Sequence, residues 1–439
     1  MKLLLKSFAK IKLSEIRCDG ITIIAGENNT GKSTIGKTLF SLFNSIHNLN
    51  DKIENERKKQ ILLFLRKHLF NLLIEADMKN LTNEKINIRR VVDRISSDVI
   101  NNVFPIEDQI QTEELYDFIY DSIKKYNTIY ENHQFGSELV ELVNKIDEIL
   151  KVPNKEIELE YISRYFQNIF YQQINSVIES ESESIINLTI KDKIMELKFK
   201  DNKCVAFDTS YNILNNAFYI DNPFVLDELN EFGFIYNENV LKSHIVSELR
   251  VDNDDMMQGV LESVSAQQKL LEIYSVLNDV VDGNITKSSD GNYYYSLGKL
   301  KEQINVNNLS TGLKSFILIK MLLEKGSLKD KDVLILDEPE IHLHPQWQIY
   351  YAELIVLLQK QFDLTIIITT HSPYFIDAIE VFSAKHNVSD RVNYYLSDIS
   401  EDYSVEVKDV TNSIELIYKK LAEPMQYLES LRNGIIKDE

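Results

Sequence analysis

The stretch GENNTGKST, residues 26–34, stands between an apolar run, ITIIAG (21–26), and a helical pattern, STIGKTLFSLFNSI (33–46). It matches G-x-x-x-x-G-K-[ST], and its place between a strand and a helix is the setting in which this motif forms a phosphate-binding loop. Amide groups of such a loop surround a phosphate, and the dipole of the following helix adds to the attraction. We therefore expect an α/β nucleotide-binding fold built on this strand, loop and helix.

Every residue of the loop is a candidate nucleotide ligand. The Lys32 ammonium would reach the β- and γ-phosphates of ATP, and the Ser33 hydroxyl would bind Mg²⁺. The predicted nucleotide-binding residues are Gly26, Glu27, Asn28, Asn29, Thr30, Gly31, Lys32, Ser33 and Thr34.

A second stretch, VLILDEPEIHLHPQ (333–346), places two acids at the end of an apolar strand. Ligands of open α/β sheets bind outside the carboxyl ends of the strands, so Asp337 and Glu338 would face the phosphate loop. Asp337 is placed to hold Mg²⁺, directly or through water, and Glu338 to polarise a water for attack on the γ-phosphate. An ordinary loop after a strand is the alternative, which the nearby phosphate loop disfavours.

A third apolar strand, LTIIIT (364–369), continues into THSPYF (370–375). His371 would lie at the same edge of the sheet, where its imidazole can sense the γ-phosphate, although a lone His after a strand is most often structural. His342 and His344 stand two residues apart, but no further ligand has a usable spacing, so a metal site is disfavoured. We expect these two to shape the turn after Glu338 or to contact a second subunit.

Residues 307–316, NNLSTGLKSF, open another helical pattern. Ser310 is a candidate N-cap because its hydroxyl can accept the amide hydrogens of the first turn. A helix that begins at Ser-Thr-Gly is also suited to an anion. The sequence therefore predicts two phosphate-binding sites, far apart along the chain.

Apolar β-branched runs that alternate with helical patterns indicate a parallel α/β core. Residues 51–180 contain a single glycine and carry apolar residues at helical spacing, which predicts helices interrupted at Pro105 and Pro153. A hairpin is expected around Asp290 and Gly291. The predicted segments are 1–50 (N-terminal part of the nucleotide-binding head), 51–185 (helical insertion), 186–224 (strands of the head), 225–283 (second helical insertion) and 284–439 (C-terminal part of the head).

The net charge of −20 argues against a surface adapted throughout to sequence-independent DNA binding, but it is compatible with a local basic patch. Residues 51–100 hold 11 Lys or Arg against 8 Asp or Glu, whereas residues 101–185 hold 6 against 17. Two solvated helical faces are the simpler interpretation. A basic strip that contacts nucleic acid or an acidic partner is the other.

No apolar stretch approaches eighteen residues, and Lys6, Lys10 and Lys12 interrupt the N-terminal apolar run. We therefore expect neither a membrane span nor a signal peptide. Cys18 and Cys204 lie far apart and lack a metal-like spacing. Both fit inert core residues in a reducing compartment, so we expect a cytoplasmic protein.

In chain order, GENNTGKST, LSTGLKS, LILDEPE and TTHSPYF resemble the Walker A, signature, Walker B and switch-histidine motifs of the ABC-type P-loop ATPase head. The spacing agrees, with 27 residues from Ser310 to Asp337 and 34 from Asp337 to His371. LSTGLKS departs from the transporter signature LSGGQ. Together with EPEIHLHPQWQ it is similar to the AAA-15/AAA-21 branch, which includes OLD-family proteins and ATPases of bacterial anti-phage systems. The resemblance covers the core and not the helical insertions.

This resemblance implies a shared ATP site. In ABC-type heads the signature of one subunit caps the ATP held by the Walker A loop of another, so Ser310, Thr311 and Gly312 would grip a γ-phosphate in trans. One Walker A and one signature per chain then imply a head-to-tail homodimer or a higher oligomer. The glutamine that follows a strand in such heads has no clear counterpart, and Asp221 or Asn222 stands nearest to its place.

The resemblance also implies a biological role. About 70 residues follow His371, too few for the Toprim nuclease domain of OLD proteins, and no H-N-H arrangement is found elsewhere. The chain thus resembles a stand-alone ATPase subunit of Septu-like, retron-associated or PARIS-like anti-phage systems, which controls a separate HNH or Toprim nuclease. The alternative is a DNA-repair or chromosome-maintenance ATPase that binds DNA ends as an ATP-gated scaffold, although its usual long coiled coil is missing.

Overall fold

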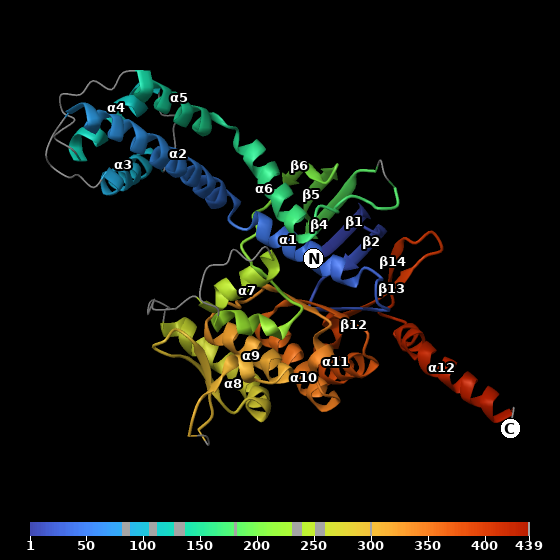
Figure 1. The fold of residues 1–439 in the computed structure, drawn as a ribbon. Coiled ribbons are helices and arrows are strands. Elements are labelled where there is room, and N and C mark those ends of the chain that lie inside the picture. Colours follow the sequence, from blue (N-terminus) through green and yellow to red (C-terminus); the bar gives the residue numbers. More distant parts are fainter. Residues whose placement is uncertain are drawn as a thin grey trace. The chain divides into compact units, whose positions relative to one another are not determined.

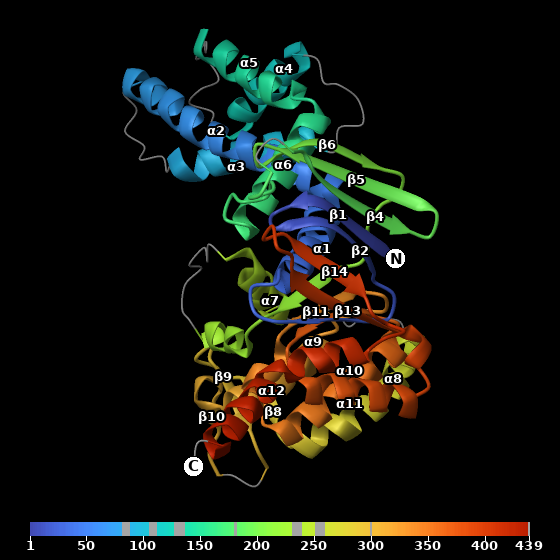
Figure 2. The ribbon, with the colours of Figure 1, turned by 90° about the vertical axis from the view of Figure 1, so that its right-hand side faces the viewer.

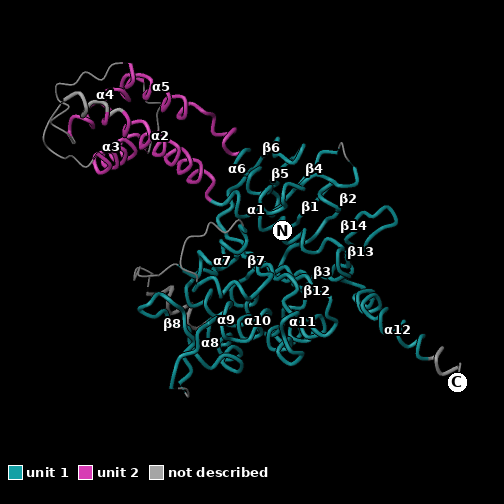
Figure 3. The backbone as a smooth tube through the Cα atoms, viewed as in Figure 1, with its two compact units in different colours: residues 1–47, 159–439 teal, residues 48–158 magenta. Residues whose placement is uncertain are grey.

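The computed structural model of the chain describes residues 1–80, 88–104, 112–126, 137–179, 182–230, 239–250, 260–298 and 301–437. The chain divides into two compact units (Figures 1 and 3). Unit 1 comprises Met1–His47 and Leu159–Glu439, and unit 2 comprises Asn48–Glu158. None of the helices in the described ranges is long and apolar enough to span a membrane.

Unit 1 is built on a large mixed sheet with the strand order β6-β5-β4-β1-β2-β14-β13-β3-β12-β11-β7 in the part of the chain described (Figures 1 and 2). The strands are β1 (Lys2–Phe8), β2 (Ile11–Arg17), β3 (Ile21–Gly26), β4 (Ser184–Ile190), β5 (Lys193–Lys200), β6 (Lys203–Thr209), β7 (Ala217–Ile220), β11 (Val333–Asp337), β12 (Thr365–Thr370), β13 (Val392–Ile399) and β14 (Val405–Asp409). Strands β7, β11, β12, β3 and β13 are mutually parallel, as predicted for the core. The neighbouring pairs β2–β1, β1–β4, β4–β5 and β5–β6 are antiparallel, so the sheet is mixed. The prediction of an α/β fold is confirmed.

Helices cover both faces of the parallel strands, which explains why those strands are apolar almost throughout. The covering helices are α1 (Lys32–Ile46), α9 (Thr311–Glu324), α10 (Pro345–Phe362) and α11 (Pro373–Lys385). Side chains alternate along β11: Leu334 and Leu336 join the core cluster that holds the buried residues of α9 to α11. Ile335 points to the opposite face, where it meets α1 at Gly36. Asp337, two residues after Ile335, therefore emerges on the α1 face.

The predicted second insertion, residues 225–283, packs into the core of unit 1. It contains η2 (Pro223–Asn230), α7 (Val240–Arg250) and α8 (Val260–Val280). Leu226, Leu249 and Leu277 are fully buried in the same cluster as β11 and α9 to α11. Periodicity predicted the helices, but their apolar faces are used to cover the head and do not form a core of their own.

The remaining elements of unit 1 include the predicted hairpin around Asp290, formed by β8 and β9 in antiparallel pairing. They are β8 (Asn284–Lys287), β9 (Tyr293–Ser296), β10 (Ile304–Asn305), η3 (Val306–Asn308), η4 (Pro339–His342), η5 (Ser389–Arg391) and the C-terminal helix α12 (Glu415–Lys437). Cys18 and Cys204 are buried free thiols, as expected.

Unit 2 is helical and has its own apolar core. It contains α2 (Leu49–Asn80), α3 (Ile88–Val103), α4 (Thr112–Tyr126), α5 (Ser137–Lys151) and the start of α6 (Asn154–Ile169). Leu65, Ile95, Ile119 and Leu142 are among the buried residues that these helices share. Pro153 separates α5 from α6, whereas Pro105 lies outside the described residues.

The helical unit ends at Glu158, well before residue 185, where the predicted insertion ends. The difference comes from the second half of α6, which packs on the sheet of unit 1. The Phe166 ring lies 4.9 Å from the ring of Phe199 on β5. A continuous helix thus joins two units, and periodicity within one helix does not reveal which residues pack on which core.

Candidate functional site

The loop between β3 and α1 has the geometry that its motif predicts. Gly31 precedes α1 with φ 80°, a left-handed conformation that favours glycine. A Cβ added there would lie 3.2 Å from the methyl groups of Val405. The Thr30 hydroxyl donates a 2.8 Å hydrogen bond to the carbonyl of Glu27 and closes the loop. These contacts hold the first amides of α1 at the carboxyl edge of the sheet.

The side chain of Lys32 is only 4% exposed. Its ammonium donates to the carbonyls of Gly26 and Glu27 at 2.8 and 2.7 Å. It also lies 3.6 Å from a carboxylate oxygen of Glu338. Burial lowers the pKa of Lys32, and the Glu338 carboxylate opposes that shift. The cation is therefore held over the loop, beside one of the predicted catalytic acids.

Asp337, the predicted magnesium ligand, accepts three side-chain hydrogen bonds. Ser33 donates to its Oδ1 at 3.0 Å, Thr369 donates to the same oxygen, and Tyr219 donates to Oδ2. The register explains this convergence, because Thr369 is the β12 partner of Asp337 and Tyr219 is the β7 partner of Ile335. A hydroxyl and a carboxylate side by side are oxygen ligands that suit Mg²⁺. Ser33 and Asp337 would hold the ion.

Sequence reasoning missed Tyr219 and Thr369. Both lie in strands made mostly of apolar residues, so the hydroxyl group is the one feature of each that could suggest a polar role. The sequence of a strand does not reveal which strand pairs with it. Burial, and then the Asp337 carboxylate, raise the pKa of Tyr219 well above its usual value. The phenol therefore keeps its proton and remains a hydrogen-bond donor.

Glu338 has a left-handed backbone conformation, with φ 51° and ψ 52°, which is uncommon for a residue with a side chain. Its amide donates to the carbonyl and the hydroxyl of Thr369, at 3.0 and 3.1 Å. These bonds hold the turn in place and leave the carboxylate at the rim of the site, 22% exposed. Such outliers persist where the surroundings enforce them and are frequent at functional sites.

His371 lies beside two carboxylates. Its Nδ1 is 3.7 Å from Glu338 and 3.6 Å from Glu340. Glu340 is almost fully buried and accepts hydrogen bonds from the Thr370 hydroxyl at 2.5 Å and the His371 amide at 3.1 Å. Burial raises the pKa of Glu340. Glu340 is a third residue that sequence reasoning missed, although it belongs to the quoted stretch DEPE, residues 337–340.

The structure thus brings Lys32, Ser33, Asp337, Glu338 and His371 into one site at the carboxyl edge of the parallel strands. The family model described as AAA ATPase domain matches residues 1–376, which include all five. The chain belongs to this AAA ATPase family. Membership implies that it binds a nucleotide.

Two curated relatives of this AAA ATPase have informative names. The chain is 28% identical over 179 residues to the Septu protein PtuA of Bacillus thuringiensis, a match that covers 37% of the chain and 41% of that relative. It is 20% identical over 404 residues to the Retron Vc95 probable ATPase of Vibrio cholerae serotype O1 biovar El Tor, covering 85% of the chain and 70% of that relative. The chain therefore matches less than half the length of PtuA.

Among solved structures, the SMC head domain from Thermotoga maritima is similar at a TM-score of 0.38 and 10% identity. The match covers 93% of this AAA ATPase and 98% of that chain.

The second predicted phosphate-binding site of this AAA ATPase lies at the start of α9. Ser310 is the N-cap, and its Oγ accepts from the amide of Leu313 at 3.4 Å. A Cβ on Gly312 would lie 3.0 Å from the Trp347 ring, so a side chain there would have to displace that ring by a few tenths of an ångström. Among the described residues, no hydrogen bond or ion pair links residues 310–312 to the loop 26–34. Helix α9 packs on the face of β11 that carries Leu334 and Leu336, whereas α1 packs on the opposite face, against Ile335.

Other candidate residues have structural contacts. His344 caps α10, with its Nδ1 accepting from the Gln346 amide at 3.3 Å, and the His342 ring packs edge-on against Phe224. These contacts agree with the expectation that the pair shapes the turn. In the described ranges no group of three or more His, Cys, Asp or Glu side chains could hold a metal. Asp221 and Asn222 follow β7, and the Asn222 side chain accepts from the Phe224 amide at 2.9 Å.

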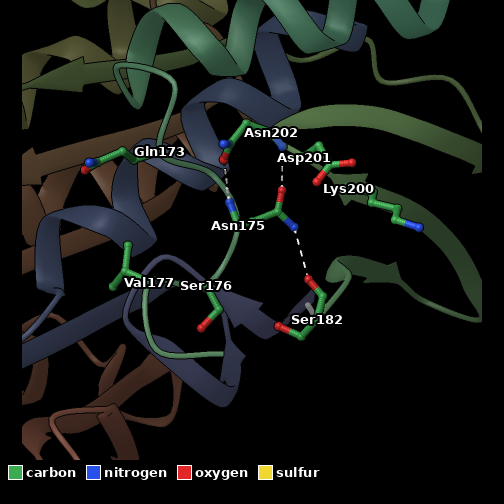
Figure 4. A pocket seen from close by; sticks show the side chains of 8 residues that line it. All are labelled: Gln173, Asn175, Ser176, Val177, Ser182, Lys200, Asp201 and Asn202. Carbon is green, nitrogen blue, oxygen red and sulfur yellow. Dashed lines mark hydrogen bonds between the residues drawn. The ribbon is translucent and has the colours of Figure 1, made fainter. Parts of the chain in front are cut away.

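A polar cavity of about 480 Å³ lies beside β5 and β6 (Figure 4). Asn175 and Asn202 dominate its wall and bond to each other's backbone, the Asn175 amide donating to Asn202 at 2.9 Å. The Asn175 side chain also donates to the carbonyls of Ser182 and Phe199. These bonds tie the segment after α6 to the strands, so we interpret the cavity as a structural feature.

Proposed function

We propose that this AAA ATPase is the ATP-hydrolysing subunit of a bacterial anti-phage defence complex, in which two copies complete the ATP sites and a separate nuclease is the effector. The family and the names of its Septu and retron relatives support this proposal. The observation that carries it is the convergence of Lys32, Asp337 and Glu338 beside the loop 26–34.

Hydrolysis would use the residues that lie together at the carboxyl edge of the parallel strands. The amides of the loop and the Lys32 ammonium bind and orient the phosphates. Mg²⁺, held by Ser33 and Asp337, would supply positive charge to the phosphate oxygens. Glu338 takes a proton from water as the water oxygen bonds to the γ-phosphorus, and the bond from that phosphorus to ADP breaks. His371, next to Glu338, would position this carboxylate and contact the γ-phosphate.

Composite sites are favoured because one chain has one loop and one signature. Ser310, Thr311 and Gly312 present a helix N-terminus at which a γ-phosphate can bind, but no hydrogen bond or ion pair connects it with residues 26–34 in the described part of the same chain. A second copy placed head to tail would bring each signature to the other's loop.

A separate effector is suggested by the resemblance to Septu-like and retron-associated ATPases, and the names of the two relatives support that resemblance. The neighbouring gene distinguishes this role from the alternative, an ATP-gated scaffold at DNA ends. A small HNH or Toprim nuclease reading frame next to this gene supports the defence role. A phosphoesterase or repair operon supports the scaffold.

The first test measures ATP turnover and ATP binding together. We expect Glu338→Gln to bind ATP normally and hydrolyse it about 10²–10⁴-fold more slowly, because the base is lost while the phosphate contacts remain. Lys32→Ala is the comparison and should weaken ATP binding itself. Unchanged turnover in Glu338→Gln would remove this residue from its proposed role.

The same preparations test the separate effector. Purified chain should leave plasmid and RNA uncut with Mg²⁺ or Mn²⁺. Metal-dependent cleavage that a point change in this chain abolishes would contradict the proposal.

A further inference from the structure

Unit 2 has one strongly basic side, formed by the outer surfaces of α2 and α3. We call it the basic face, and it consists of the exposed residues Lys59, Arg66, Lys67, Arg89, Arg90 and Arg94. On α2, Lys59, Arg66 and Lys67 are seven and eight residues apart, so they lie on one side of the helix. The buried residues Ile61, Leu65 and Leu69 form the other side, which faces the core.

The two helices meet along this face. Arg66 on α2 forms a 3.0 Å ion pair with Asp93 on α3, and the helices lie side by side in both views (Figures 1 and 2). On α3, Arg90 and Arg94 are four residues apart and share the outer surface. The six cations therefore form one surface.

Few acids compensate this charge. Asp93 is paired with Arg66, and Glu56 accepts a hydrogen bond from Gln60. In the described part of the chain, no ion pair is found for Lys59, Lys67 or Arg94. The chain as a whole has a net charge of −20, and α4 and α5 together carry eight Asp or Glu against four Lys. A positive surface of this kind, in so acidic a protein, fits an anionic partner.

The side chains of the basic face indicate which class of anionic partner it binds. Lys and Arg bind phosphates, and the carboxamide beside Lys59 on α2, that of Gln60, donates to the Glu56 carboxylate. Bases of single strands stack on exposed aromatic rings. On α2, Phe64 and Phe70 are packed against the core of unit 2, and the exposed His68 ring already lies against Phe64, with 4.1 Å between the ring centroids. Duplex RNA is recognised through its 2′-hydroxyls, and the proton of the Ser97 hydroxyl on α3 is already donated to the Asp93 carbonyl.

We propose that the basic face of unit 2 binds the phosphate backbone of double-stranded DNA without reading its sequence. This inference does not depend on the proposed ATPase role. It gives the chain a nucleic-acid surface of its own, in a unit whose helices carry none of the nucleotide-site residues.

The test compares two triple variants of the full chain. Lys59→Ala, Lys67→Ala and Arg94→Ala remove three cations of the basic face. Lys125→Ala, Lys145→Ala and Lys151→Ala remove the same charge from α4 and α5, where each lysine pairs with an acid. Fluorescence anisotropy with labelled duplex DNA of two unrelated sequences measures binding at 50 to 200 mM salt, with circular dichroism to verify folding.

We expect wild-type binding to weaken with salt and to be alike for both sequences. The basic-face variant should bind more weakly, and the slope of log K against log salt should be shallower by about one per cation removed, about three in all. The control variant should retain the wild-type slope. Equal effects of the two variants, or no wild-type binding at 50 mM salt, would overturn the proposal. So would tighter binding of duplex RNA, of single-stranded DNA or of polyglutamate in parallel titrations.

Discussion

At the scale of single residues, the site depends on hydroxyl groups that hold the Asp337 carboxylate. Ser33, Thr369 and Tyr219 approach it from α1, β12 and β7. Three donors on one carboxylate fix its orientation, and such outer contacts tune the affinity of a metal site. Tyr219 is the donor with the largest apolar body, and its burial keeps the phenol neutral.

Tyr219→Phe removes one hydrogen bond and no packing. We expect the Mg²⁺ concentration for half-maximal ATPase activity to rise, or turnover to fall, by about 10–100-fold. Tyr211→Phe is the matched control, because that hydroxyl donates to the Leu188 carbonyl at 3.2 Å, away from the site. ATPase rates of both variants, measured across a magnesium titration, show whether the change is specific to Tyr219→Phe. An identical titration for both variants would mean that Asp337 needs no support from Tyr219.

At the scale of elements, the position of α1 depends on its close approach to the sheet. Gly36 allows it, since a Cβ there would lie 2.7 Å from a methyl of Ile335 and 3.2 Å from the Tyr219 ring. The helix that carries Lys32 and Ser33 is therefore packed against the strand that carries Asp337. A shift of α1 would separate the halves of the site.

Gly36→Ala tests this packing. Alanine favours a helix by about 1 kcal/mol, but overpacking costs about 1–3 kcal/mol, so we expect a net loss on the order of 1 kcal/mol. That corresponds to about 2–4 °C in the Tm of the unit 1 transition. ATP affinity should also fall, because α1 must move. Gly298→Ala is the control, with no atom within 4 Å of the added methyl, and it should change neither quantity. A Gly36→Ala variant more stable than the wild type would show that the strands can move to accommodate the added methyl group at little cost.

At the scale of the whole molecule, the helices that begin at the two predicted phosphate-binding sites pack on opposite faces of β11. Residues 26–34 lie at the start of α1, and Ser310 caps α9, which packs on η2 and η4. A trans arrangement predicts complementation between two defective chains. Ser310→Arg keeps the Walker loop and blocks the signature, whereas Lys32→Ala keeps the signature and holds ATP poorly.

Each homodimer of these variants should be nearly inactive. With random subunit exchange about half of the dimers are mixed, and each has one intact site, so about a quarter of wild-type ATPase activity should return if sites act independently. A tag pull-down verifies the exchange. Full activity of the wild type in a verified monomer would contradict the shared site.

The sequence by itself determined the local features of this protein. The loop 26–34 follows its strand, Asp337 ends another, Ser310 caps a helix and Asp290 lies in a hairpin turn, as predicted. Each of these depends on residues adjacent along the chain, whose periodicity and turn chemistry are visible in the sequence. The charge asymmetry of residues 51–185 was visible in the same way.

Only the tertiary structure decided which distant residues meet. Tyr219 reaches Asp337 across 118 positions, and Glu340 comes to lie under His371, because β7, β11 and β12 are neighbours in the sheet. The helices of residues 225–283 joined the core of the head, and α6 was divided between two units. Alternation along a strand tells which side chains share a face, but strand order and register decide their partners, and those follow from the packing of the whole chain.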